Sequence, residues 1–176
     1  MVRHQFTLDE VLELIGQGMV DQRVQLLGGE IYDMPSDGAQ HARFAMGIGR
    51  QFMASLPQSF FIGVQTTLKL SDHNAPSPDV YVLSGNLPDG DVAPSQILLV
   101  VEVGDTTLSS DLNYKARLYA EHGVQEYWVI DVNARCIHVH RDPRDGAYPQ
   151  PQVLDAATSV AARLVPDVPI RLADLG

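Results

Sequence analysis

The sequence contains a single cysteine, Cys136, and only two lysines, Lys69 and Lys115, among 176 residues. One cysteine cannot form an internal disulfide, which fits a protein of a reducing compartment. No apolar run approaches the roughly 20 residues that span a bilayer. The segment MVRHQFTLDEV also lacks the apolar stretch of a signal peptide. We therefore expect a cytoplasmic protein that does not enter a membrane.

Positive charge is scarce as well. Twelve Lys and Arg face 22 Asp and Glu, which gives a net charge of −10. Proteins that hold DNA by its phosphates usually present a basic surface, so this balance argues against tight non-specific binding. It does not exclude metal-dependent chemistry on phosphodiesters, because divalent cations offset the charge of carboxylates.

The pattern of hydrophobic and turn residues predicts one α/β domain with a mixed sheet. A helix is expected over residues 7–16, where Thr7 and Glu10 form a capping box. A hairpin should follow around Gly28 and Gly29. The next expected elements are a helix over 39–55 and strands over 60–70 and 79–83.

The stretch from residue 97 to residue 132 is the most informative for the fold. The apolar run ILLVVEV predicts a strand buried on both faces, SSDLNYKARLYAEHG a helix, and QEYWVIDV a second strand. We expect Ser110 or Asp111 to cap this helix and Gly123 to end it. A strand, a helix and a strand in this order form a crossover unit whose strands are parallel.

RCIHVHR should add a strand, paired as a hairpin through Asn133, and residues 148–176 should form edge strands and coil. The core of the domain is therefore predicted to span residues 24–141.

Three charged residues break the local pattern. Glu102 interrupts the apolar strand, Asp79 follows Pro78 at the start of a strand, and Lys115 lies on the apolar stripe of the predicted helix. A buried charge costs several kcal/mol unless it is paired or neutralised. Two carboxylates and an amine that converge would suit Mg²⁺-dependent hydrolysis.

Each of the three also has an ordinary explanation. Asp79 after a proline is compatible with a simple turn or strand-start residue. Glu102 lies near a strand end, where its side chain would reach solvent, and Lys115 would extend its ammonium past the sheet into water. Spacing alone does not decide between these readings.

SPDVYVL and LLVVEVGDTTLSSDLNYKARLYAEHGVQEYWVIDV together resemble the family of putative restriction endonucleases within the PD-(D/E)XK nuclease superfamily. LLGGEIYDMPSDGAQHARFAMGIGRQF is similar to the acidic hairpin and following helix of that family. The resemblance implies a restriction-endonuclease-like mixed β-sheet flanked by helices, and a Mg²⁺- or Mn²⁺-dependent site that hydrolyses DNA.

By position, the resemblance implies that Asp79 and Glu102 are metal ligands, joined by the backbone carbonyl of Val103. The superfamily lysine would fall two residues after Glu102, where this sequence has Gly104. Families of this kind place the lysine on the following helix, and Lys115 is the matching residue.

Three further residues are candidates of lower rank. Glu30 resembles the family's N-terminal acid and is either another metal ligand or a hairpin residue in solvent. His41 is a minor candidate, because a histidine on a lone helix is more often a capping or surface residue. Gln65, on the strand before Asp79, is placed to orient a water.

Two other patterns point to structure rather than function. Cys136, His138 and His140 alternate and so share one strand face, as zinc ligands do, but no fourth ligand is evident and outer strands often carry polar faces. Tyr127 and Trp128 are expected to pack in the core rather than to stack on bases. Glu126 beside them is expected to cap or to pair at the helix–strand turn rather than to bind metal.

Three functional hypotheses follow. The first is a Mg²⁺-dependent endonuclease that acts on DNA as a two-fold homodimer, since a dimer presents two sites to two strands. The second is a nuclease-derived module that binds nucleic acid or protein and has lost catalysis, which the net charge and Gly104 favour. In the third, the proximity of the three charged residues is accidental.

Overall fold

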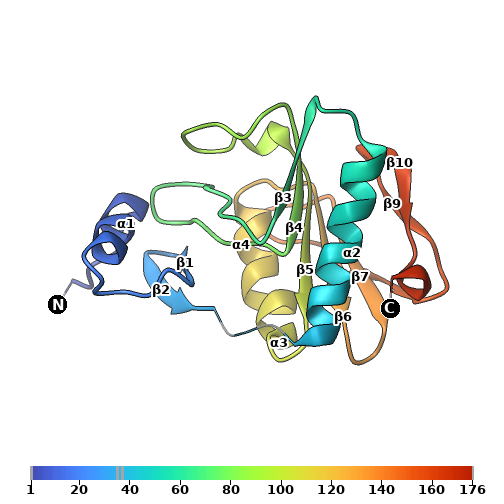
Figure 1. Ribbon diagram of the computed structural model, residues 1–176, viewed down its shortest axis with the longest axis horizontal. Coiled ribbons are helices and arrows are strands. Elements are labelled where there is room, and N and C mark those ends of the chain that lie inside the picture. Colours follow the sequence, from blue (N-terminus) through green and yellow to red (C-terminus); the bar gives the residue numbers. More distant parts are fainter. Residues whose placement is uncertain (1, 35, 37, 176) are drawn as a thin grey trace.

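The computed structural model describes residues 2–34, 36 and 38–175. Its centre is one six-stranded sheet in the order β3-β4-β5-β6-β7-β8 (Figure 1). The strands are β3 Phe60–Val64, β4 Val80–Ser84, β5 Ile97–Gly104, β6 Glu126–Asp131, β7 Cys136–Arg141 and β8 Gln152–Asp155. β5 and β6 are parallel and all other neighbours are antiparallel, so the predicted mixed sheet and crossover unit are confirmed.

Helices and two small hairpins surround this sheet (Figure 1). The helical elements are α1 Leu8–Gly16, α2 Ala39–Ser55, η1 Pro94–Gln96, α3 Leu108–Ser110, η2 Asp111–Lys115, α4 Ala116–Glu121 and η3 Leu172–Asp174. The hairpins are β1 Val24–Leu27 with β2 Glu30–Asp33, and β9 Val160–Ala162 with β10 Val165–Ile170. Among the described residues, no helix combines the length and apolar character that crossing a membrane requires.

The hydrophobic core lies in two layers, one on each face of the sheet. Val101 and Val103 of β5 pack in the layer that includes Phe44 of α2. Val100 packs in the other layer, together with Tyr119 of α4. Because side chains alternate along a strand, Glu102 points to the same face as Val100, toward α4.

Several predicted elements match the structure closely. Thr7 and Glu10 form the expected capping box, and α2 spans the predicted residues. Gly28 and Gly29 turn the β1–β2 hairpin with φ of 60° and 74°, a region that glycine enters without strain. Gly123 follows α4 with φ of 73°, which confirms it as the residue that ends the helix.

Two boundaries were predicted wrongly. The strand expected over 60–70 ends at Val64, because Gln65 has a φ of 48° and leaves the extended conformation. The third helix begins at Leu108 with Thr107 as its N-cap, one residue before the predicted segment that starts at Ser109, so neither Ser110 nor Asp111 begins it. Asp111 is therefore free to use its carboxylate elsewhere.

Glu126 ties the C-terminal hairpin to the main sheet. Its Oε1 accepts hydrogen bonds from Trp128 Nε1 and Arg141 Nε, both at 2.8 Å. Its Oε2 accepts one from the backbone N–H of Arg163, next to β9, at 2.8 Å. The expected pairing role of Glu126 is thus confirmed, and Trp128 is fully buried.

Gly63 provides the space for an aromatic residue that supports the segment after β3. Gly63 lies directly opposite Tyr81 on β4, and the tyrosine ring covers the position that a Cβ would occupy. The Tyr81 hydroxyl donates to the carbonyl of Thr67 at 3.2 Å and accepts from Thr66 Oγ1 at 3.1 Å. Because Gly63 has no side chain, the Tyr81 ring fits there and its hydroxyl holds residues 66 and 67 in place.

We expect Gly63→Ala to destabilise the protein by about 1–3 kcal/mol, because the added methyl displaces the Tyr81 ring from a packed core. Urea denaturation would measure the change. Gly90→Ala is the control: nothing lies within 4 Å of a Cβ at this loop position, so its effect should stay within about 0.5 kcal/mol. Equal stability of the two variants would contradict the assignment of Gly63.

Candidate active site

The register of β4 and β5 brings the two acidic residues together. Val80 pairs with Val101 in this antiparallel ladder, and one further step places Asp79 opposite Glu102. Residues directly opposite one another project from the same face of a sheet. Asp79 is 7% exposed and Glu102 is 3% exposed. Glu102 therefore does not reach solvent as its ordinary reading described, and Asp79 is buried just before the start of its strand.

Contacts from three elements fix the Asp79 carboxylate. Its Oδ2 accepts a hydrogen bond from the backbone N–H of Val103 at 2.7 Å. Its Oδ1 lies 3.2 Å from Nε2 of His41 on α2 and 3.5 Å from Nε2 of Gln65. His41 is buried, so the expectation of a capping or surface histidine was wrong. His41 and Gln65 both act on Asp79.

The backbone carbonyl of Val103 faces the same place. Within a strand, the N–H and C=O of one residue point to the same side, and the Val103 N–H points to Asp79. Continuing the β4–β5 register by two residues places Pro78 opposite Val103. Proline has no N–H, so it cannot donate the ladder hydrogen bond that this carbonyl would otherwise accept.

Glu102 is held by two residues of the following helix. Its Oε1 accepts a hydrogen bond from the Tyr119 hydroxyl at 2.8 Å. Its Oε2 lies 2.9 Å from Nζ of Lys115, which is also 3.2 Å from Oδ1 of Asp111. Lys115 is only 7% exposed, so its ammonium does not extend past the sheet into water.

Burial and neighbouring charges shift the pKa of both partners. Burial raises the pKa of Glu102 to about 8, although the Lys115 ammonium acts in the opposite direction. For Lys115, burial lowers the pKa, but the carboxylates of Glu102 and Asp111 outweigh burial, and the resulting pKa lies above its ordinary value. Lys115 therefore stays charged at neutral pH and serves as a donor rather than as a base.

The position of Gly104 explains why the lysine is on the helix. A Cβ at Gly104 would lie 2.9 Å from the backbone Cα of Leu108 and 2.9 Å from its Cδ1. The start of α3 thus packs directly against the strand at the position two residues after Glu102. A lysine cannot occupy this position without displacing α3, and the amine comes from the next helical turns instead.

A widened helical turn places the amine. Residues Asp111–Lys115 form a π-helical turn, η2, between α3 and α4. Such turns are rare and often occur at functional sites. The carbonyl of Asp111 accepts a hydrogen bond from the Tyr127 hydroxyl at 2.9 Å, and its Oδ2 accepts one from Thr107 Oγ1 at 2.7 Å.

Asp111 and Tyr119 are the site residues that sequence reasoning missed. They lie four residues before and four residues after Lys115, and residues four apart share a helix face. This spacing would have placed both on the helix face of Lys115, where Asp111 pairs with the lysine and Tyr119 donates to Glu102. From the sequence, Asp111 was interpreted only as a possible helix cap, and the apolar stripe around Lys115 includes Tyr119.

Much of this cluster borders one cleft of about 650 Å³. Five predicted site residues line it: His41, Gln65, Asp79, Glu102 and Lys115. Glu30 lies outside this lining. Its carboxylate pairs with Arg3 at 2.6 Å and accepts a hydrogen bond from the Tyr32 hydroxyl at 2.8 Å.

The family model described as putative restriction endonuclease (Uma2) matches residues 8–173, nearly the whole chain. The chain belongs to this family. Among solved structures, it is similar to a putative nuclease belonging to DUF820 from Anabaena variabilis ATCC 29413. The TM-score is 0.73 at 18% identity, with 97% of each chain covered, which shows the shared restriction-endonuclease-like fold. No curated protein matches the sequence.

The residues of the cleft fit the divalent cation that this family implies. Mg²⁺ and Mn²⁺ prefer carboxylate and carbonyl oxygens, and Asp79, Glu102 and Val103 offer three such groups side by side. Each carboxylate oxygen has about two lone pairs, so one contact to a neighbour leaves capacity for a cation. Burial is the main cause of the raised pKa of Glu102, and the carboxylates of Asp111 and Asp79 add to it, a contribution that a cation would offset.

Lys115→Met should destabilise the protein by about 3–5 kcal/mol, because it leaves Glu102 and Asp111 buried without their cation. The double variant Lys115→Met/Glu102→Gln should recover part of this loss. Lys69→Met is a matched control, since Lys69 pairs with the exposed Asp72 and Asp91 and should cost no more than about 1 kcal/mol. Urea denaturation of the four proteins would test this, and equal losses for the two lysines would contradict it.

The raised pKa of Glu102 predicts a pH dependence of stability. In the unfolded chain Glu ionises near its ordinary value of about 4.3, whereas the folded value is about 8. Between these values the folded protein holds a proton that the unfolded chain has released, so the contribution of Glu102 to stability falls as pH rises.

Without divalent metal, the stability of Glu102→Gln relative to the parent should therefore increase from pH 5 to pH 8, by roughly 1 kcal/mol or more. Urea denaturation in the presence of a chelator would measure this. Glu126→Gln controls for the loss of a buried carboxylate elsewhere. A stability difference that does not change with pH would show that Glu102 is ionised throughout.

Proposed function

We propose that this protein is a Mg²⁺- or Mn²⁺-dependent endonuclease that hydrolyses phosphodiester bonds in DNA. The observation that carries the proposal is the convergence of Asp79, Glu102 and Lys115 in one cleft, from two neighbouring strands and the helix that follows them. Membership of the putative restriction endonuclease family supports the same reaction class.

In this proposal Asp79, Glu102 and the Val103 carbonyl hold the metal. A bound Mg²⁺ would polarise the phosphate and lower the pKa of a coordinated water. The hydrogen bond from Val103 N–H fixes the Asp79 carboxylate before the cation arrives. His41 and Gln65 position the same carboxylate through its other oxygen, Oδ1. Glu30 remains a candidate for a further ligand, from the neighbouring β1–β2 hairpin.

Lys115 has a different role from the ligands. Its raised pKa keeps the ammonium charged, so it donates hydrogen bonds and does not accept the proton of the attacking water. We assign to it the orientation of that water and the stabilisation of negative charge on the phosphate as this charge develops. Asp111 and Tyr119 hold the lysine and its partner Glu102 in place.

The substrate would be held weakly by charge alone, since the chain carries a net charge of −10. Cleavage of both strands would be easiest for a two-fold dimer, which presents two equivalent sites. We therefore propose a homodimer as the active form. Its mass in solution can be measured by light scattering with and without divalent metal.

Incubation with supercoiled plasmid and Mg²⁺ or Mn²⁺ tests the activity. The parent should nick or linearise the plasmid, and Glu102→Gln should slow this at least about 100-fold, since it removes a ligand and the partner of Lys115. Glu121→Gln is the matched control: Glu121 is an exposed carboxylate of α4 that pairs with Arg117. It should cleave at the parental rate.

If Glu102→Gln still cleaves the plasmid at the parental rate, the proposed site is not the catalytic one. The runner-up function, an inactive module that binds nucleic acid or protein, has its own signature. It would take up Mn²⁺ in a Glu102-dependent manner and bind DNA or a protein without cutting. Calorimetric titration of the parent and Glu102→Gln with Mn²⁺ tests metal uptake, which both functions require, and the plasmid assay then separates them, because only the enzyme cuts.

A further inference from the structure

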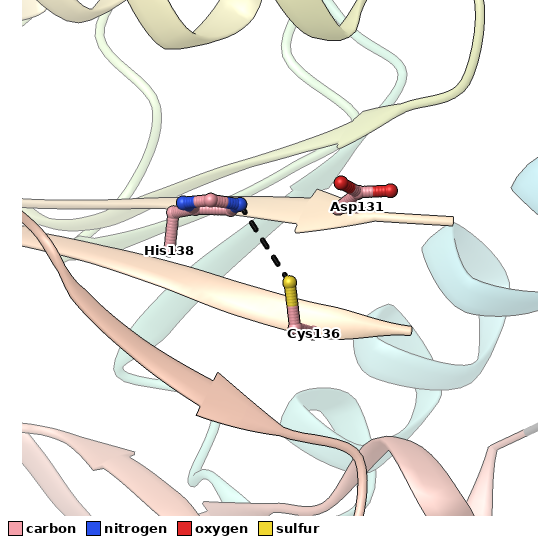
Figure 2. A group of neighbouring side chains, drawn as sticks. All are labelled: Asp131, Cys136 and His138. Carbon is pink, nitrogen blue, oxygen red and sulfur yellow. Dashed lines mark hydrogen bonds between the residues drawn. The ribbon is translucent and has the colours of Figure 1, made fainter. Parts of the chain in front are cut away.

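A second group of possible metal-binding side chains lies at the turn between β6 and β7. One donor atom each from Asp131, Cys136 and His138 lies within 4.8 Å of the other two. Figure 2 shows these side chains on the two neighbouring strands, with the imidazole and the thiol facing one another. None of the three lines the cleft that contains Asp79 and Glu102.

The strand register explains the convergence. Asp131 and Cys136 are directly opposite one another in the antiparallel β6–β7 ladder. Their side chains therefore project from the same face, with Cβ atoms about 5 Å apart. His138 follows Cys136 by two residues, so its side chain emerges from that face as well. The hairpin backbone thus brings the three groups together.

The spacing of the sulfur and nitrogen atoms fits a tetrahedral metal. Cys136 Sγ and His138 Nε2 are 3.6 Å apart. With zinc–sulfur and zinc–nitrogen bonds of about 2.3 and 2.0–2.1 Å, a tetrahedral angle separates the two ligand atoms by about 3.6 Å. The observed distance between Cys136 Sγ and His138 Nε2 therefore equals the distance expected between two ligands of one zinc ion.

The carboxylate is fixed in position by the turn. Oδ1 of Asp131 accepts a hydrogen bond from the backbone N–H of Ala134 at 2.8 Å. Ligating carboxylates are commonly held by such a contact, and the second oxygen stays available. Arg135, with a φ of 51°, completes the tight turn that returns the chain to Cys136.

We propose that Asp131, Cys136 and His138 form a binding site for a zinc-type transition metal ion. The ion would link β6 to β7 at their shared turn, with a water molecule in the fourth position. Cysteine and histidine favour zinc over magnesium, which prefers oxygen ligands. The site is therefore chemically distinct from the acidic cleft.

This ligand set differs from the alternating triplet in the sequence. His140 lies on the same strand face, but its ring packs against Tyr127 and Tyr148 with centroid separations of 5.5 and 5.4 Å. It belongs to an aromatic group further along β7. The third ligand is instead Asp131, which lies outside the alternating triplet and faces Cys136 from the neighbouring strand β6.

Cobalt is a suitable probe, because Co²⁺ adopts zinc sites and a bound thiolate gives an intense near-ultraviolet absorption. The chain has only one cysteine, so this absorption reports Cys136 alone. The titration is carried out on the full chain in excess Mg²⁺, which occupies oxygen-ligand sites. We expect the absorption to saturate at one Co²⁺ per chain and to disappear on addition of Zn²⁺.

Variants then identify the other ligands. His138→Ala and Asp131→Asn should each weaken Co²⁺ binding at least tenfold, and Asn can still accept the Ala134 hydrogen bond. Cys136→Ser should lose the absorption. His140→Gln is the control on the same strand and should bind as the parent does. Glu102→Gln should also bind normally, which separates this site from the proposed catalytic one.

Three outcomes would overturn the proposal. One is the absence of thiolate absorption in the folded parent. Another is saturation at half a Co²⁺ per chain, which would assign the ion to a contact between two copies. The third is unchanged affinity in both His138→Ala and Asp131→Asn. Circular dichroism of each variant would show whether a loss of binding reflects a loss of fold.

Discussion

The buried pair of Glu102 and Lys115 is the interaction on which the site depends. Glu102 lies in β5, a strand whose residues are all buried, where a lone carboxylate would cost several kcal/mol. Its partners Lys115 and Tyr119 both come from the helix that connects β5 to β6. The same crossover that makes the two strands parallel therefore also brings the groups that make Glu102 tolerable. Fold and candidate site are specified by one segment of chain.

Two residues shape this site by what they lack. Gly104 has no side chain, so α3 packs directly on β5 and the connecting helix begins close to the strand. Pro78 has no N–H, so the carbonyl of Val103 meets no ladder donor at the register position opposite it. Because residue 104 has no side chain, the amine near Glu102 is that of Lys115. Because Pro78 has no N–H, the carbonyl oxygen of Val103 is left without a ladder partner beside Asp79. Under the proposed function, Lys115 supplies the amine that Gly104 cannot, so Gly104 alone gives little support to a loss of chemistry.

The sequence allowed the crossover unit, the limits of α2 and the three unusual charges to be predicted, because these features depend on local patterns of hydrophobicity and on single residues that break them. It did not reveal the π-helical turn, the burial of His41 or the positive φ of Gln65. Each of these depends on contacts with distant segments: Asp111 with Tyr127, and His41 and Gln65 with Asp79. A pattern within one segment carries no information on such partners, although the four-residue spacing around Lys115 was a signal that could have identified Asp111 and Tyr119 and was not used.

The charge of the cleft bears on how an acidic protein would admit an anionic substrate. Glu102 and Asp111 share the buried ammonium of Lys115, and Asp79 adds a third carboxylate to the site, so without a cation the site is either negatively charged or protonated at Glu102. A phosphodiester approaching this site would meet carboxylates rather than a basic surface. In the proposed enzyme a divalent cation reverses the sign of the local field, so metal binding must strengthen the binding of DNA phosphate at the cleft, and by reciprocity DNA must strengthen the binding of metal. With a net charge of −10, the chain lacks the excess of positive charge that would hold DNA without a metal, so the proposed enzyme would depend on metal for substrate binding as well as for chemistry.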